Sequence, residues 1–106
     1  MFNVPNFITN NRVTGKALNI INNFKHSLEN KIILIENADP GFDWIFTKKI
    51  KGFATQFGGA SSHMAIRAAE LNIPAVIGCG QKNFDELKNS LEIEIDCLNK
   101  KTTILK

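Results

Sequence analysis

The chain has 106 residues, of which 43% are hydrophobic and 22% are charged. This length suits one compact domain, and the composition is that of a globular rather than a disordered or fibrous protein. The net charge is +3, but the lysines are scattered without interleaved aromatic residues, which disfavours a nucleic-acid-binding surface. No apolar run approaches the roughly 20 residues of a membrane-spanning helix. We therefore predict a single cytoplasmic domain over residues 1–106 that binds neither nucleic acid nor membrane.

Cys79 and Cys97 are the two cysteines of the chain. They lack CxxC spacing and the neighbouring His or Cys residues that a zinc site needs, so we expect reduced, structural thiols and no metal site. His26 has no motif around it, and we interpret it as a surface residue.

The first third of the chain contains one clear strand. Residues 4–8 are a short apolar stretch interrupted by Pro5, which favours an edge strand. Residues 12–21 fit a helix and a strand equally well, with Gly15 as a bulge in the second case. Residues 31–35 (KIILI) form a continuous aliphatic run between polar residues, which is typical of a strand buried on both faces.

A helix start follows this strand. Asp39 can accept bonds from free helix N–H groups, and Pro40 presets the dihedral angle of a first helical residue. We predict a short helix through Trp44 and Phe46, whose aromatic rings pack in the core rather than form a ligand platform. We interpret Asp43 as an isolated carboxylate.

A second strand is predicted over residues 52–55 (GFAT), and it leads directly into Gly58 and Gly59. A glycine pair permits positive φ angles and the close approach of another group to the backbone.

A second helix should follow the glycine pair. Ser61 and Ser62 supply N-cap oxygens, and residues 64–71 (MAIRAAEL) are strong helix formers, so the helix begins near Ser62 or His63. It ends by Asn72, which tolerates the left-handed conformation, and the proline two residues later prevents continuation.

The remaining residues complete a mixed α/β pattern. Residues 75–78 (AVIG) predict another buried strand, and residues 84–87 predict a helical turn. Residues 91–97 (LEIEIDC) alternate apolar and acidic side chains, so with residues 102–105 they predict a terminal hairpin.

The candidate chemistry lies between the glycine pair and Gly80, where His63 stands at a helix N-terminus. The unpaired N–H groups and dipole of a first turn favour negative charge by about 0.3–1 kcal/mol. The same field disfavours an imidazolium, which would keep His63 neutral and nucleophilic. Arg67 follows four residues later on the same helical face and could contact a phosphoryl oxygen, although a solvated surface arginine is an equal alternative. Glu70 is isolated and two turns from His63, too far for direct proton transfer.

The segment GGASSHMAIRAAELNIPAVIGCG resembles a family signature, approximately GGxTSHxAIxARxxGIPAVVG. The family is the mobile phosphohistidine domain of phosphoenolpyruvate (PEP) synthase, pyruvate phosphate dikinase and enzyme I of the bacterial sugar phosphotransferase system. The likeness covers residues 31–80 well and the flanks loosely. Ala69 stands where the family has an arginine, for which Arg67 could compensate, and Asn72 replaces a glycine. The matching residues are Gly58, Gly59, Ser62, His63, Ala65, Ile66, Ala68, Ile73, Pro74, Ala75, Val76 and Gly78.

The resemblance implies an α/β fold of the swivelling β/β/α type, a small sheet barrel with the phosphohistidine at a helix N-terminus. It implies that His63 is transiently phosphorylated and that Ser61 replaces a threonine whose hydroxyl supports the imidazole or its phosphate. The residues expected to bind or support phosphate are Gly58, Gly59, Ser61, Ser62 and Arg67.

The resemblance also implies that this chain is one domain of a larger phosphotransferase and is inactive alone. In a PEP synthase-like dikinase, His63 would take phosphate from ATP, with AMP and inorganic phosphate released, and pass it to an acceptor such as pyruvate. In the sugar-transport relative, PEP is the donor. We expect no cofactor in this domain, Mg²⁺ and ATP in an ATP-grasp partner domain, and a separate acceptor-binding domain.

Three alternatives remain open. The same carrier could serve a kinase for another small molecule, such as glutamine or an antibiotic. A noncatalytic binding module that kept the fold is a second alternative, supported by the alanine at position 69 and opposed by the intact His63. A basic nucleic-acid-binding domain is the third, and it does not explain the spacing around His63.

Overall fold

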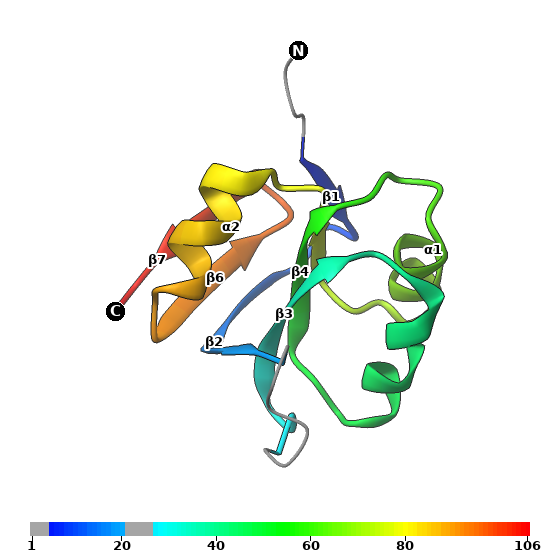
Figure 1. The fold of residues 1–106 in the computed structure, drawn as a ribbon, viewed down its shortest axis with the longest axis horizontal. Coiled ribbons are helices and arrows are strands. Elements are labelled where there is room, and N and C mark those ends of the chain that lie inside the picture. The colour runs from blue at the N-terminus through cyan, green and yellow to red at the C-terminus, as the bar shows by residue number, and fades with distance from the viewer. Residues whose placement is uncertain (1–4, 21–26) are drawn as a thin grey trace.

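The computed structural model describes residues 5–20 and 27–106. Within these residues the chain forms a seven-stranded sheet, two α-helices and one 3₁₀ helix (Figure 1). The predictions for Val4, Ile21 and His26 lie outside the described residues. The strands are β1 (Asn6–Ile8), β2 (Arg12–Asn19), β3 (Lys31–Asn37), β4 (Gly52–Phe57), β5 (Ala75–Ile77), β6 (Glu92–Asp96) and β7 (Lys101–Ile104). The helices are the 3₁₀ helix η1 (Pro40–Thr47), α1 (His63–Leu71) and α2 (Gln81–Lys88).

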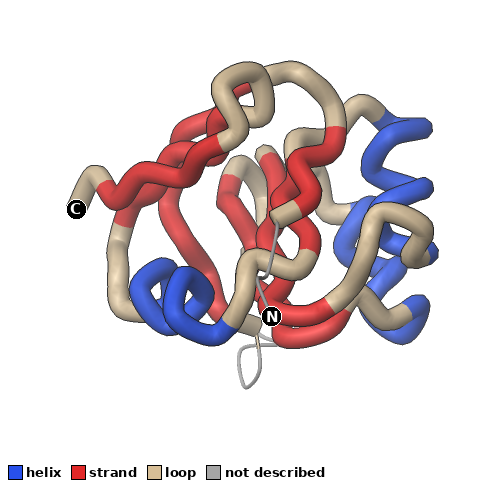
Figure 2. Tube along the Cα trace, turned by 90° about the horizontal axis from the view of Figure 1, so that it is seen from above, coloured by secondary structure: helices blue, strands red, loops and turns tan. Residues whose placement is uncertain are grey.

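The strand order is β1-β5-β4-β3-β2-β6-β7. The four central strands, β5, β4, β3 and β2, run parallel, whereas β1 at one edge and the β6–β7 hairpin at the other are antiparallel to their neighbours. The sheet curls into a half-barrel, with η1 and α1 together on one side and α2 on another (Figures 1 and 2). The predicted α/β class is confirmed.

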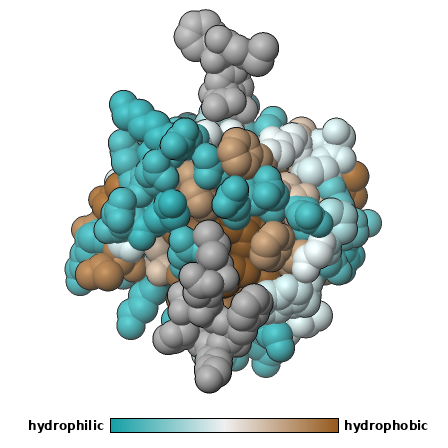
Figure 3. Space-filling model, viewed as in Figure 1, coloured by the Kyte–Doolittle hydropathy of each residue, from teal (hydrophilic) through white to brown (hydrophobic). Residues whose placement is uncertain are grey.

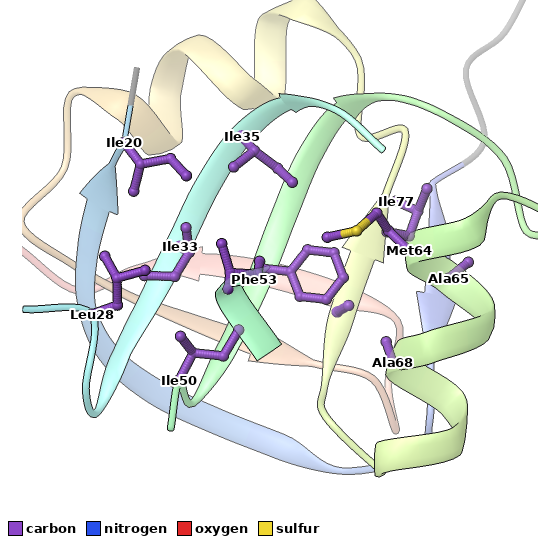
Figure 4. Close-up of a cluster of buried hydrophobic side chains, with 12 residues drawn as sticks. Ile20, Leu28, Ile33, Ile35, Ile50, Phe53, Met64, Ala65, Ala68 and Ile77 are labelled. Atoms are coloured by element: carbon purple, nitrogen blue, oxygen red, sulfur yellow. The ribbon is translucent and has the colours of Figure 1, made fainter. Parts of the chain in front are cut away.

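Two apolar clusters fill the space on the two faces of the sheet, and β3 contributes to both. Ile33 and Ile35 belong to the cluster under α1 and η1, while Ile32 and Leu34 belong to the cluster under α2 and β6. All four side chains are at most 1% exposed, so the prediction of a strand buried on both faces is confirmed. In the first cluster, drawn in Figure 4, Met64 of α1 lies close to the aromatic ring of Phe53 from β4.

Within the described part of the ambiguous segment, the structure has a strand, β2, over Arg12–Asn19. Local periodicity could not decide this, but β2 pairs with β3 on one side and β6 on the other, and these long-range bonds select the extended form. The predicted bulge at Gly15 is wrong, because the register with β6 is continuous and pairs Gly15 with Ile93.

The remaining predicted elements are present, with two differences in extent or type. The turn predicted at residues 84–87 is part of the longer helix α2, and the short helix after Pro40 is of the 3₁₀ type. The terminal hairpin and the edge strand at Asn6–Ile8 are confirmed.

The surface is mostly hydrophilic on the face shown in Figure 3, with apolar side chains in separate patches. In the described residues, neither α-helix is long and apolar enough to cross a membrane.

Candidate functional site

The candidate site lies where β4 ends and the chain turns into α1. Gly58 adopts φ 127°, and a Cβ at this position would lie 2.7 Å from the Cβ of Ala38. Gly78 adopts φ 72°, and a Cβ there would collide with the carbonyl oxygen of Gly58. Glycine is therefore required at both positions for the turn to pack against the end of β5. Gly59 is different, because the space around its Cα is open.

A buried hydroxyl holds the two glycine positions together. Thr55 is 0% exposed, and its Oγ1 donates to the carbonyl of Phe57 at 2.8 Å while accepting from the amide of Gly78 at 2.9 Å. These bonds continue the connection between β4 and β5 after the strand pairing ends at Ala54 and Val76. The turn before α1 thus starts from a fixed point.

Both ends of α1 agree with the sequence prediction. Ser62 is the N-cap, and its Oγ accepts from the amide of Ala65 at 3.4 Å. Asn72 is the C-cap in the left-handed conformation, with φ 55° and ψ 42°. Met64, Ala65 and Ala68 bury one face of the helix in the core, so His63 at its first position points toward the outside.

The imidazole of His63 contacts a carboxylate. Its Nε2 lies 2.8 Å from Oδ1 of Asp43, and the two side chains are 42% and 44% exposed. The interpretation of Asp43 as isolated is therefore wrong: η1, whose first turn is capped by Asp39, packs beside α1 and brings Asp43 to His63 across 20 positions of sequence. The imidazole therefore stands at the N-terminus of α1 with a carboxylate from a second element beside it.

Arg67 lies next to the same carboxylate. Its Nε is 3.5 Å from Oδ1 of Asp43, its Nη1 is 3.2 Å from Oε1 of Glu70, and its Cζ is 5.9 Å from the ring centre of Phe46. The sequence predicts that His63 and Arg67 share one face of the helix, and Asp43 contacts both of these side chains. Glu70 is not isolated either, since it pairs with Arg67 one turn away on α1.

Comparison with known proteins identifies the family. Residues 28–100 match the family model of the PEP-utilising enzyme, mobile domain. The chain belongs to this family. It is similar to the phosphoenolpyruvate synthase of Neisseria meningitidis serogroup B, with 36% identity over 66 residues, which are 62% of this chain and 8% of that protein. It is also similar to the phosphoenolpyruvate-protein phosphotransferase of Buchnera aphidicola, with 37% identity over 97 residues, which are 89% of this chain and 16% of that protein.

The mobile domain therefore spans only a small part of the length of the curated relatives it matches. Its fold is also similar to the solution NMR structure of a UPF0107 protein, with a TM-score of 0.70 and 15% identity over 99% of this chain and 98% of that chain. At this identity the likeness concerns the fold.

The residues expected to support phosphate in this mobile domain differ in their surroundings. Ser61 and Gly59 are exposed, whereas Ser62 is half-buried and caps α1, with its own amide bonded to the carbonyl of Gly59 at 3.0 Å. Ala69, at the position of the family arginine, is exposed on α1. Phosphate binding by the glycines, the serines and Arg67 stays a prediction.

Both cysteines of the mobile domain are free and buried. Burial raises the pKa of Cys79 from 9.0 to about 11, and it also raises the pKa of Cys97. Thiols in this state are poor nucleophiles, in line with the structural role that the sequence predicts. Among residues 5–20 and 27–106, no three His, Cys, Asp or Glu side chains gather as a metal site would require.

Proposed function

We propose that this mobile domain is a phosphoryl carrier and that His63 is the residue that holds the phosphoryl group. The observation that carries the proposal is the position of a 42% exposed imidazole at the first residue of α1, directly after the glycine turn. In the reaction, the lone pair of a ring nitrogen forms an N–P bond, and the P–O bond to the donor's leaving group breaks. Storing the group on His63 divides one difficult transfer into two easier ones.

The start of α1 supports this role because it offers donors to an anion. Ser62 accepts two hydrogen bonds: its Oγ accepts from the amide of Ala65, and its carbonyl oxygen accepts from the amide of Ile66. Within the described residues, the amides of His63 and Met64 have no protein acceptor. Free amides in a first helical turn, together with the helix dipole, favour a phosphoryl group beside the ring.

The donor and acceptor must come from other domains, because the chain spans 8–16% of the two relatives described above. In the PEP synthase-like form of the proposal, an ATP-grasp domain binds ATP and Mg²⁺, AMP and inorganic phosphate leave, and an acceptor such as pyruvate receives the group. The carrier itself binds no cofactor. The phosphoenolpyruvate-protein phosphotransferase relatives favour a second candidate, in which PEP is the donor and a protein is the acceptor.

The test is to incubate the chain and its nucleotide-binding partner domain with ATP labelled at the β or the γ position, and in parallel the chain and a PEP-binding partner domain with labelled PEP. We expect alkali-stable, acid-labile label on the wild-type chain and none on His63→Ala. The variant His26→Ala, which removes the other histidine of the chain, should keep the label. Label from β-labelled ATP supports dikinase chemistry, and label from PEP supports the second candidate. Undiminished label on His63→Ala would contradict the carrier role of this residue.

A further inference from the structure

One carboxylate oxygen lies between the imidazole and the guanidinium. Oδ1 of Asp43 is 2.8 Å from Nε2 of His63 and 3.5 Å from Nε of Arg67. Because a carboxylate can only accept hydrogen bonds, this contact requires a proton on Nε2. Nε2 is therefore engaged by Asp43 in the resting protein.

A phosphoryl group on Nε2 would need the same place. An oxygen joined to Nε2 through one phosphorus atom lies about as far from the nitrogen as a hydrogen-bonded oxygen does. A phosphoryl oxygen at Nε2 would thus replace Oδ1 of Asp43 and stand within reach of Nε of Arg67.

We propose that Asp43 occupies the position of the phosphoryl group in the unphosphorylated chain. When His63 is phosphorylated, Arg67 exchanges its contact with Asp43 for a contact with the phosphoryl oxygens. This inference rests on the proposed carrier function. It makes Asp43 the residue that positions the ring before transfer, and Arg67 the residue that holds the product.

The contacts of Arg67 favour such an exchange. Its Nη1 is held by Glu70 at 3.2 Å and its guanidinium lies over Phe46, so neither contact depends on Asp43. A phosphoryl group carries more negative charge than a carboxylate, so it competes well for the guanidinium. Asp43 is 44% exposed and can turn to water when the phosphoryl group repels it.

The proton balance follows from the resting contact. Attack needs the lone pair of Nε2, so the Nε2 proton leaves to solvent while Nδ1 takes up a proton from solvent. The Nε2 pair then forms the N–P bond, and the leaving group departs with the electron pair of the bond that breaks. Asp43 can then no longer accept a hydrogen bond from Nε2. Asp43 leaves the ring, and the contact between Asp43 and Arg67 is broken as well.

The test uses phosphoramidate, a small reagent that phosphorylates histidine without any partner domain as its P–N bond breaks and ammonia leaves. In ¹⁵N-labelled 106-residue chain, NMR would follow the ring nitrogens of His63 and the Nε–H of Arg67 before and after treatment. We expect phosphate on Nε2 and a shift of the Arg67 Nε–H signal. Phosphorylation at Nδ1, no reaction at His63, or an unchanged Arg67 signal would overturn the proposal.

Hydrolysis of the phosphohistidine separates the roles of the two residues. Arg67→Gln should shorten its half-life by about 3- to 10-fold, since one charge-assisted hydrogen bond is lost, and Arg67→Lys should restore part of it. Asp43→Asn should leave the half-life unchanged or longer, because a competitor for Arg67 is gone. The matched control is Asp85→Asn, which removes an exposed carboxylate paired with Lys88 on α2 and should change nothing.

A half-life that falls as far in Asp43→Asn as in Arg67→Gln would contradict the exchange. Circular dichroism of each variant would show that the fold is kept. Since the reagent bypasses donors and acceptors, failure of labelling by ATP and PEP would count against the proposed function, and failure of the exchange would appear here alone.

Discussion

The two α-helices begin in similar ways but differ in what they present. Each follows a parallel strand of the sheet and a glycine with positive φ, Gly58 before α1 and Gly80 before α2. α1 has a side-chain cap and an exposed imidazole at its first position, whereas the N-cap of α2 is Gly80, with no side-chain hydrogen bond. A glycine turn before a helix is therefore not sufficient for a site. The side chains of His63 and Arg67, and a carboxylate supplied by a third element, η1, make the difference.

The largest expected effect comes from removing one buried side chain from each helix. Met64 of α1 is 0% exposed and Leu87 of α2 is 2% exposed, so replacing either with Ala should cost about 2–5 kcal/mol of unfolding free energy, measured by urea denaturation. At a temperature where both variants are folded, Met64→Ala should also slow the reaction of His63 with phosphoramidate. Leu87→Ala should react at the wild-type rate, and an equal slowing in both would show that the site does not depend on α1 specifically.

The next test concerns the glycine turn. Gly78→Ala places a Cβ against the carbonyl of Gly58 at a positive φ, so it should cost about 1–3 kcal/mol in denaturation experiments. Gly59→Ala is the matched control, because its Cβ would meet open space and the expected change is within about 0.5 kcal/mol. Similar losses at both positions would mean that the close approach of the two segments is not what limits this turn.

The alkaline pH dependence of stability tests the segment before α2. Cys79 has a pKa of about 11 in the folded chain against 9.0 for the free thiol, so the unfolded chain loses this proton first as the pH rises. The thiol's contribution is fully present below pH 9.0 and is lost as the pH approaches 11, at no more than about 1.4 kcal/mol per pH unit. When the unfolding free energies of wild type and Cys79→Ala are plotted against pH, the two profiles should therefore run parallel below this range. Within the range, the wild type should lose stability faster than the variant. Parallel profiles throughout would argue against a buried, protonated thiol.

The smallest expected effect is at the cap that distinguishes α1. Ser62→Ala removes the acceptor for the amide of Ala65 and should lower the unfolding free energy by about 1 kcal/mol. Ser61→Ala changes an exposed neighbour and should be near neutral when both variants are measured by urea denaturation. A larger loss for Ser61→Ala than for Ser62→Ala would indicate that Ser61, and not Ser62, caps the helix.

The sequence predicts those features that depend on neighbouring residues. The caps at Ser62 and Asn72, the start of η1 at Asp39 and the aliphatic strand β3 follow from local chemistry, and the structure places them as expected. The position of His63 at the start of α1 belongs to the same class.

The contacts of Asp43 could not be predicted in this way. Its approach to His63 depends on how η1 packs on α1, and a single exposed carboxylate within a short helix carries no signal of a partner 20 residues away. The strand form of β2 was equally inaccessible, because its hydrogen bonds go to β3 and to β6, which follows some 80 residues later.

The alternating burial of β3 has a mechanical consequence. Ile33 and Ile35 bind one helical layer to the sheet, and Ile32 and Leu34 bind the other, so neither layer can loosen without disturbing the same strand. Melting of either side removes the support of the opposite side, and we expect the chain to unfold in one cooperative step despite its two separate apolar interiors.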